Sequence, residues 1–134
     1  MTLVLCLDDE CGMMFNHRRQ SRDRILIAEL LKTVGENRLF VSPYSKTLFA
    51  EGTTTITVAD DPCAVAGKDD FVFVEDTDPS DAWERVTTLI IYRWNSLYPA
   101  DTYFTCDLTG FRMTDVTAFE GSSHEFINKE IWKK

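Results

Sequence analysis

An arginine-rich segment near the N-terminus holds the densest group of residues that could do chemistry. It runs from His17 to Arg24, and four of the chain's eight arginines lie in it. A guanidinium can donate two parallel hydrogen bonds to a carboxylate or a phosphate, and the start of a helix adds free backbone N–H groups. The segment therefore predicts a site for a small anionic ligand. The candidate ligand-binding residues in it are His17, Arg18, Arg19 and Arg22.

The same arginines could have a structural role instead. Acids lie close by in the sequence at Asp8, Asp9 and Asp23, and ion pairs with them would fasten the segment to the first strand. The guanidinium groups could also dock on an acidic protein partner. The sequence leaves ligand binding, internal pairing and protein interaction open.

Asp23 is the carboxylate within this segment. We expect it in the first turn of a helix that begins near Ser21, where its charge suits the helix dipole. A carboxylate there could accept two hydrogen bonds from the N–C–N edge of a pterin-like or guanine-like ring. It could equally pair with Arg19 or Arg24. Asp23 is therefore a candidate ligand-binding carboxylate, with the structural role as the alternative.

Asp8 and Asp9 follow the first apolar run, at the place where open α/β sheets usually bind ligands. Both are candidate ligand-binding residues. With Asp76 or Asp78 they could also hold Mg²⁺, but strand-end acids more often terminate a strand or pair with arginines, so we expect no metal. The four cysteines include no C-x-x-C pair, which argues against a structural zinc site.

The chain's two histidines are His17 and His124. Either could act as an acid or base near neutral pH. Neither is accompanied by a nucleophile motif such as G-x-S-x-G. We interpret His124 as a turn residue, because it follows Gly121-Ser-Ser at a plausible hairpin turn.

The length and the net charge of the chain argue against several classes of protein. The 134 residues suit a single domain spanning 1–134, and the net charge is −8, from 14 Lys and Arg against 22 Asp and Glu. That balance argues against general binding of nucleic acid or of anionic membranes. No apolar run approaches 18 residues, so we expect neither a signal peptide nor a membrane span, and a cytoplasmic location.

Hydrophobic periodicity predicts an α/β fold. The continuous apolar run Leu3–Leu7 indicates a central strand, and apolar residues at helical spacing predict a helix from Ser21 to Gly35. Further strands are expected at 38–42, 53–58, 71–74 and 86–94, with brief helical segments at 46–49, at 62–66 and after Asp78-Pro79. Segments 111–119 and 126–132 should form a C-terminal antiparallel hairpin. Together they predict a mostly parallel central sheet with flanking helices.

This order of elements, with several short patterns, resembles dihydrofolate reductase over nearly the whole chain. Gly12-Met-Met looks like that family's flexible loop after the opening strand, and 126–133 looks like its last strand. The resemblance places Asp23 where the family keeps its single catalytic carboxylate. It implies a pterin-type substrate and NADPH as cofactor.

The cofactor corner departs from that family. Where the family has paired glycines that let the backbone approach a pyrophosphate, this chain reads Glu75-Asp-Thr-Asp-Pro-Ser-Asp81. Four carboxylates there would repel a phosphate, so no cofactor is expected. The favoured function is a non-reductase binding or regulatory domain for a small anionic or heterocyclic ligand, pterin- or nucleotide-like. An NADPH-linked pterin-type reductase is the alternative, and a homo-oligomer is possible.

A second resemblance is to short bacterial proteins that sometimes carry the label ribonuclease Z. It rests on residues 12–21, with Arg93-Trp-Asn and Tyr98-Pro-Ala-Asp101. Ribonuclease Z is a two-metal hydrolase and needs a cluster of histidines and aspartates. With two histidines 107 residues apart, this chain is judged not to be such an enzyme.

Overall fold

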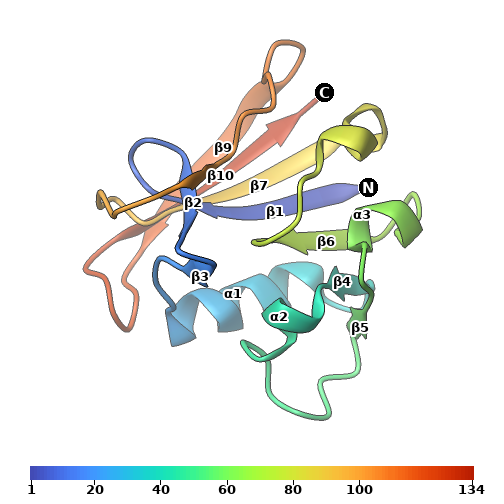
Figure 1. Ribbon diagram of the computed structural model, residues 1–134, viewed down its shortest axis with the longest axis horizontal. Helices are drawn as coiled ribbons and strands as arrows, with labels where there is room; N and C mark the ends of the chain where they lie inside the picture. Colours follow the sequence, from blue (N-terminus) through green and yellow to red (C-terminus); the bar gives the residue numbers. More distant parts are fainter.

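A seven-stranded sheet forms the frame of the computed structural model, which describes residues 1–134 (Figure 1). Its order is β5-β4-β6-β1-β7-β10-β9. The strands are β1 (Thr2–Leu7), β4 (Leu39–Val41), β5 (Ile56–Val58), β6 (Phe71–Val74), β7 (Thr88–Arg93), β9 (Arg112–Phe119) and β10 (Ile127–Lys133). Neighbours from β5 to β7 pair in parallel, whereas β10 is antiparallel to both β7 and β9. The mostly parallel sheet and the C-terminal hairpin are thus confirmed.

β1 is the central strand, as its unbroken apolar sequence predicts. It pairs with β6 on one side and β7 on the other, with Leu3 opposite Val72 and Leu89. Leu3, Val4 and Leu5 have no exposed surface, because layers of side chains cover both faces of the sheet.

Four helical segments connect these strands: α1 (Arg24–Val34), α2 (Pro43–Lys46), α3 (Pro62–Val65) and the 3-10 helix η1 (Ser80–Arg85). The sequence prediction was wrong about the start of α1. Asp23 is the N-cap and accepts from the backbone N–H groups of Ile25 and Leu26, so the helix begins after Asp23 and not near Ser21. The helix near 46–49 was also misplaced, because Ser42 caps α2 and Pro43 takes its first position.

The first part of the arginine-rich segment, from His17 to Arg19, belongs to a β-hairpin. β2 (Gly12–Phe15) pairs with β3 (Arg18–Arg19) and with β8 (Thr102–Tyr103) in a second, three-stranded sheet. Asn16 and His17 form the two-residue connection, with φ of 51° and 61°. Two successive left-handed residues are typical of a tight hairpin turn, and Asn tolerates that conformation.

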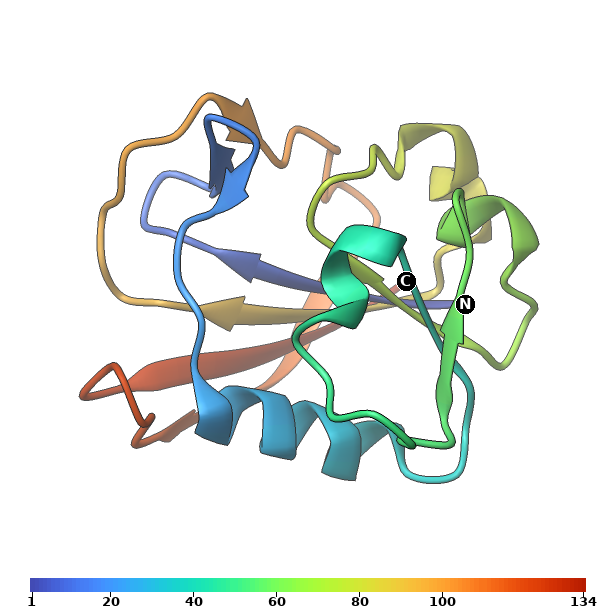
Figure 2. The ribbon, with the colours of Figure 1, turned by 60° about the horizontal axis from the view of Figure 1, so that its bottom comes forward.

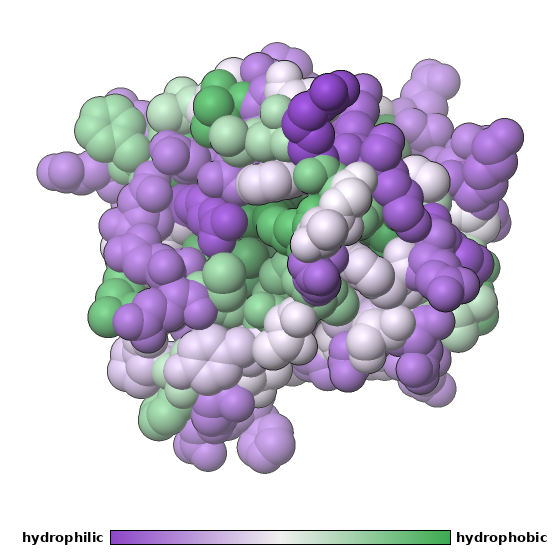
Figure 3. All heavy atoms as spheres, turned by 90° about the horizontal axis from the view of Figure 1, so that it is seen from above, coloured by the Kyte–Doolittle hydropathy of each residue, from purple (hydrophilic) through white to green (hydrophobic).

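The core has two layers, one on each face of the large sheet. Figure 2 shows α1 against one face of the sheet. Apolar side chains such as Leu26, Leu30 and Ile90 pack together in this layer. The opposite face packs against η1 and the segment around Phe104. Figure 3 views the molecule from that side, where hydrophobic side chains gather in a central hollow and hydrophilic ones surround it. No helix is long and apolar enough to cross a membrane.

Candidate functional site

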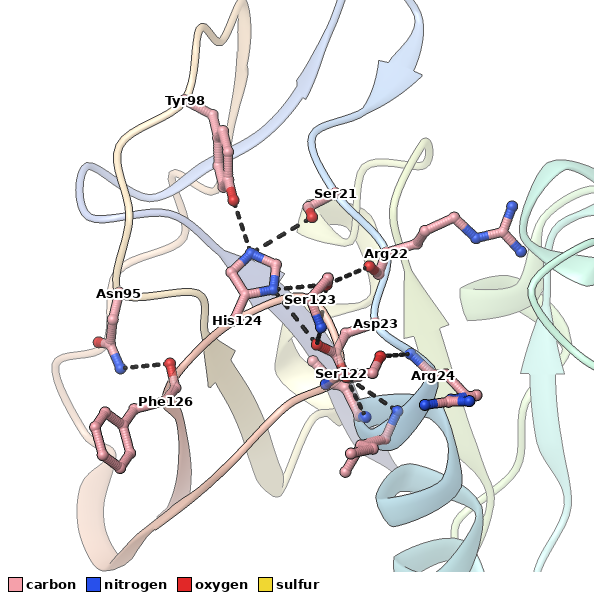
Figure 4. A network of polar contacts seen from close by, with 12 residues as sticks. Ser21, Arg22, Asp23, Arg24, Asn95, Tyr98, Ser122, Ser123, His124 and Phe126 are labelled. Atoms are coloured by element: carbon pink, nitrogen blue, oxygen red, sulfur yellow. Dashed lines mark hydrogen bonds and ion pairs between the residues drawn. The ribbon is translucent and has the colours of Figure 1, made fainter.

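Asp23 is held by the tip of the β9–β10 hairpin (Figure 4). Its Oδ1 accepts from the backbone N–H groups of Ile25, Leu26 and Ser122, each at 3.0 Å. Its Oδ2 accepts from the backbone N–H of Ser123 at 2.8 Å and from the Ser123 hydroxyl at 3.0 Å. Burial alone would raise the pKa of Asp23, but these donors outweigh it and hold the pKa well below its ordinary value.

The hairpin tip is also fastened to the residues on either side of Asp23. The Ser122 hydroxyl accepts from the backbone N–H of Arg24 at 2.9 Å, and the Ser123 hydroxyl lies 2.7 Å from the Arg22 carbonyl oxygen. A Cβ built on Gly121 would lie 2.4 Å from Asp23 Oδ2. Only glycine therefore permits this approach, and the tip completes the start of α1 from the far end of the chain.

His124 lies beside Asp23 and is nearly buried, with its side chain 6% exposed. Nδ1 is 3.4 Å from Asp23 Oδ2, and Nε2 is 2.7 Å from the Tyr98 hydroxyl and 3.4 Å from that of Ser21. The ring stacks on Trp94 with centroids 4.5 Å apart. His124 is thus a packed member of a polar network, and a plain turn residue describes it incompletely.

Arg19 is tied to the end of β6. Its guanidinium donates to both carboxylate oxygens of Glu75, at 2.9 and 3.2 Å, and lies over the Tyr44 ring. The Glu75 carboxylate also accepts from the Ser45 hydroxyl at 2.6 Å. The structural role is therefore found for Arg19, but with an acid other than those near it in the sequence.

The other predicted binding residues do not converge on one point. Arg18 and His17 are exposed on the hairpin β2–β3, whereas Arg22 is exposed at the start of α1. No ion pair engages the side chains of Arg18, Arg22 and Arg24. The ion pairs between fixed charges are Arg19–Glu75, Arg38–Asp70, Arg93–Glu130 and Lys129–Glu29. Arg22 and Arg24 lie together, on either side of the buried Asp23.

Asp8 is buried and organises the loop after β1, whereas Asp9 is exposed. Asp8 accepts from the backbone N–H groups of Gly12 and Glu10 and from the Gln20 side chain, at 2.6 to 2.9 Å. Burial would raise the pKa of Asp8, yet these donors lower it below its ordinary value. No group of three or more His, Cys, Asp or Glu side chains is placed to hold a metal ion.

Two adjoining pockets lie along α1. The first, with a volume of about 20 Å³, reaches from the end of β6 to the start of the helix and includes Gln20, Ser21 and Trp94 in its lining. The second is a groove of about 450 Å³ between Leu31 on α1 and Ala50. They share Arg22, Asp23, Ile27 and Leu48. The groove has the volume of a small-molecule site, whereas the first pocket has room only for a single small group.

Comparison with solved structures identifies the architecture. Dihydrofolate reductase from Enterococcus faecalis, in a complex with NADP(H) and RAB-propyl, superposes with a TM-score of 0.71, covering 98% of this chain and 94% of that chain. The fold is that of dihydrofolate reductase. Sequence identity to the reductase is only 8%, so the likeness concerns the fold alone. No protein-family profile and no curated protein sequence matches the chain.

The acidic corner of this dihydrofolate-reductase-like fold has its own hydrogen bonds. The Ser42 hydroxyl donates to Asp76 at 2.7 Å, as that of Ser45 does to Glu75. The Asp78 carboxylate accepts from the backbone and hydroxyl of Ser80. Ser80 is the first residue of η1, so Asp78 satisfies the first backbone N–H of that helix. The hydroxyl groups of Ser42 and Ser45 thus already donate to carboxylates.

Sequence reasoning missed the partners that define the site. Ser122 and Ser123 contact Asp23 across 99 and 100 residues, and Tyr98 contacts His124 across 26. No spacing rule joins these residues. One local signal was present. Gly121-Ser-Ser-His places several hydrogen-bonding groups on one hairpin tip beside a residue without a side chain, which is typical of a tip packed closely against another segment.

Proposed function

We propose that this domain binds a small anionic ligand with a heterocyclic or apolar part in the groove along α1, with a single small group of the ligand reaching the adjoining inner pocket. One observation carries the proposal: Arg22 and Arg24 line the groove and have no carboxylate partner, while its wall is apolar through Ile27, Leu31 and Leu48. An anionic group would pair with the guanidiniums and a ring would cover the apolar wall.

The hydrogen bonds of Asp23 leave the arginines on either side of it without this carboxylate as a partner. Six nitrogen and hydroxyl groups already contact the two oxygens of Asp23. Carboxylate oxygens offer about four acceptor sites in all, so Asp23 has no capacity left for either guanidinium. The positive charge of Arg22 and Arg24 is therefore free for a ligand.

Gln20 supplies a polar contact for the ring. Its Nε2 donates to Asp8 at 2.8 Å, but its Oε1 is buried and has no hydrogen-bond partner. Buried acceptors are nearly always paired. Gln20 lines the inner pocket, whose volume of about 20 Å³ admits a single small group, so one N–H group at the edge of a ligand ring would satisfy this oxygen. The role of Asp23 toward a ligand stays a prediction and requires the hairpin tip to move away.

The proposed function is not that of a reductase. A dinucleotide phosphate at the acidic corner would have to displace Asp76 from Ser42 and Glu75 from Ser45, against the negative charge of both. These residues do not fit NADPH. The alternative, an NADPH-linked pterin reductase, is favoured only by the shared fold.

Ligand-induced stabilisation tests the proposal. Folate and guanosine monophosphate both carry an N–C–N ring edge and anionic groups, and at least one should raise the Tm of the wild type. The shift should disappear in Arg22→Ala/Arg24→Ala and persist in Lys32→Ala/Lys68→Ala, which removes equal charge outside the groove. No shift with either compound, or an equal shift in both variants, would contradict the proposal. A Tm rise with NADPH and its oxidation by dihydrofolate would establish the reductase instead.

A further inference from the structure

The strand β9 is an exposed edge of the large sheet. It is eight residues long, and every residue from Arg112 to Ala118 is exposed. Its only strand neighbour is β10. Figure 1 shows it at the outer side of the hairpin, at the far end of the sheet from α3. A long strand with an open edge is a template for pairing with another chain.

β9 lacks most of the features by which edge strands avoid such pairing. It has no lysine and no proline, and its one register irregularity lies toward its N-terminal end, opposite Ile131 and Trp132. The opposite edge of the sheet is different, because β5 has three residues. Short edge strands are poor templates, so the two edges are not equivalent.

The backbone of β9 is oriented for an additional strand. Lys134 donates its backbone N–H to the Thr87 carbonyl at 3.1 Å. In an antiparallel pair every second residue is hydrogen-bonded to the neighbouring strand. Counting back from Lys134 in steps of two, Glu130 is therefore one of the β10 residues whose backbone bonds to β7. Val116 lies opposite Glu130 on the other side of β10. Its N–H and C=O therefore point away from β10, toward the free edge.

The side chains of β9 suit a second copy of the same strand. The only charged residues of β9 are Arg112 and Asp115, so the net charge of the strand is zero. The net charge of −8 on the whole chain makes two copies repel elsewhere. An antiparallel pairing centred on Val116 brings that side chain, 49% exposed, against its counterpart. It also places Arg112 of one copy at the same end of the ladder as Glu120 of the other.

We propose that the free edge of β9 pairs with β9 of a second copy of this chain, antiparallel about a two-fold axis near Val116. The large sheet would then continue from one copy into the other. The pairing does not use the ligand groove, because no residue of β9 lines either pocket along α1.

Molar mass in solution tests the pairing. Light scattering should give about twice the chain mass of 15.4 kDa for the wild type. Val116→Lys places a charge against its own counterpart at the two-fold axis and should give the monomer, whereas Val58→Lys, at the exposed edge strand β5, should stay dimeric. A monomeric wild type at high micromolar concentration, or a dimeric Val116→Lys variant, would overturn the proposal.

A charge exchange tests the register without relying on Val116. Arg112→Glu should raise the dimer dissociation constant, because it would face Glu120 of the other copy. Glu120→Arg added to it should restore the dimer, since the ion pair is then re-formed with reversed charges. Equal dissociation constants for wild type and Arg112→Glu would contradict the antiparallel register.

Discussion

Ser123 donates both its backbone N–H and its hydroxyl to Oδ2 of Asp23, at 2.8 and 3.0 Å, across a separation of 100 residues. The contact joins the tip of the last hairpin to the start of the first helix. It also fixes the position of Asp23, which lines both pockets along α1. The stability of the helix start and the shape of the pocket therefore depend on one carboxylate.

Replacing Asp23 by alanine should cost about 3 kcal/mol of unfolding free energy, from the lost N-cap and the unpaired N–H groups of Ser122 and Ser123. Urea unfolding followed by circular dichroism measures it. Asp9→Ala is the matched control, because Asp9 is exposed, and should change little. If Asp23→Ala lost as little unfolding free energy as Asp9→Ala, Asp23 would not stabilise the contact between the hairpin tip and α1.

Stability should fall in acid. The pKa values of Asp23 and Asp8 are raised by burial but lowered more by hydrogen bonds, and end below the ordinary 3.8. A carboxylate with a lowered folded-state pKa stabilises the fold above the unfolded-state pKa and loses that contribution as pH falls toward the folded value. The unfolding free energy should therefore decline from near pH 4 downward. Asp23→Asn should flatten that decline. If the unfolding free energy of this variant fell with pH as steeply as that of the wild type, Asp23 would not be a cause of the decline.

Gly121→Ala should detach the hairpin tip. The added Cβ would lie 2.4 Å from Asp23 Oδ2 and 2.8 Å from Ile127 Cδ1, and relieving such overlaps costs about 2 kcal/mol. Hydrogen exchange should accelerate at the amides of Ser122 and Ser123. Glu125→Ala, an exposed change in the same tip, should leave their protection intact. Equal protection of these amides in both variants would show that Gly121 does not pack tightly against Asp23.

Arg19 and Glu75 should be energetically coupled. Their side chains are 16% and 9% exposed, so removing one partner leaves a poorly hydrated charge. Glu75→Ala should cost about 2 kcal/mol, and the double variant with Arg19→Ala should cost less than the sum of both. Additive costs in a double-mutant cycle would mean that the pair contributes nothing.

The sequence predicted the frame of the fold because the frame follows local patterns. The run Leu3–Leu7 is apolar because it is buried on both faces, and Phe71–Val74 is equally continuous. Helix α1 was recognised from its spacing, and its end from Gly35, whose φ is 60°. The start of α1 was misplaced because Ser21 and Asp23 are both good caps, and only the hairpin tip decides between them.

The site was harder to predict than the fold. The arginine-rich segment was recognised by composition, but its residues separate when it folds as a hairpin: Arg19 turns to Glu75, 56 residues away, while Arg22 lies on the groove. Pairings over such distances depend on strand order, and composition does not contain that order. The turn at Asn16 and His17 was missed because histidine is an unusual residue there.

The central claim is that an anionic ligand binds along α1 beside Arg22 and Arg24. The most direct measurement is a ¹H–¹⁵N NMR titration of the wild type with folate and with guanosine monophosphate. We predict saturable shifts confined to amides lining the two pockets, such as Ile27, Ala28 and Leu48, and their loss in Arg22→Ala/Arg24→Ala. No saturable shift with either compound, or shifts centred on the acidic corner at Asp76 and Asp78, would contradict the account.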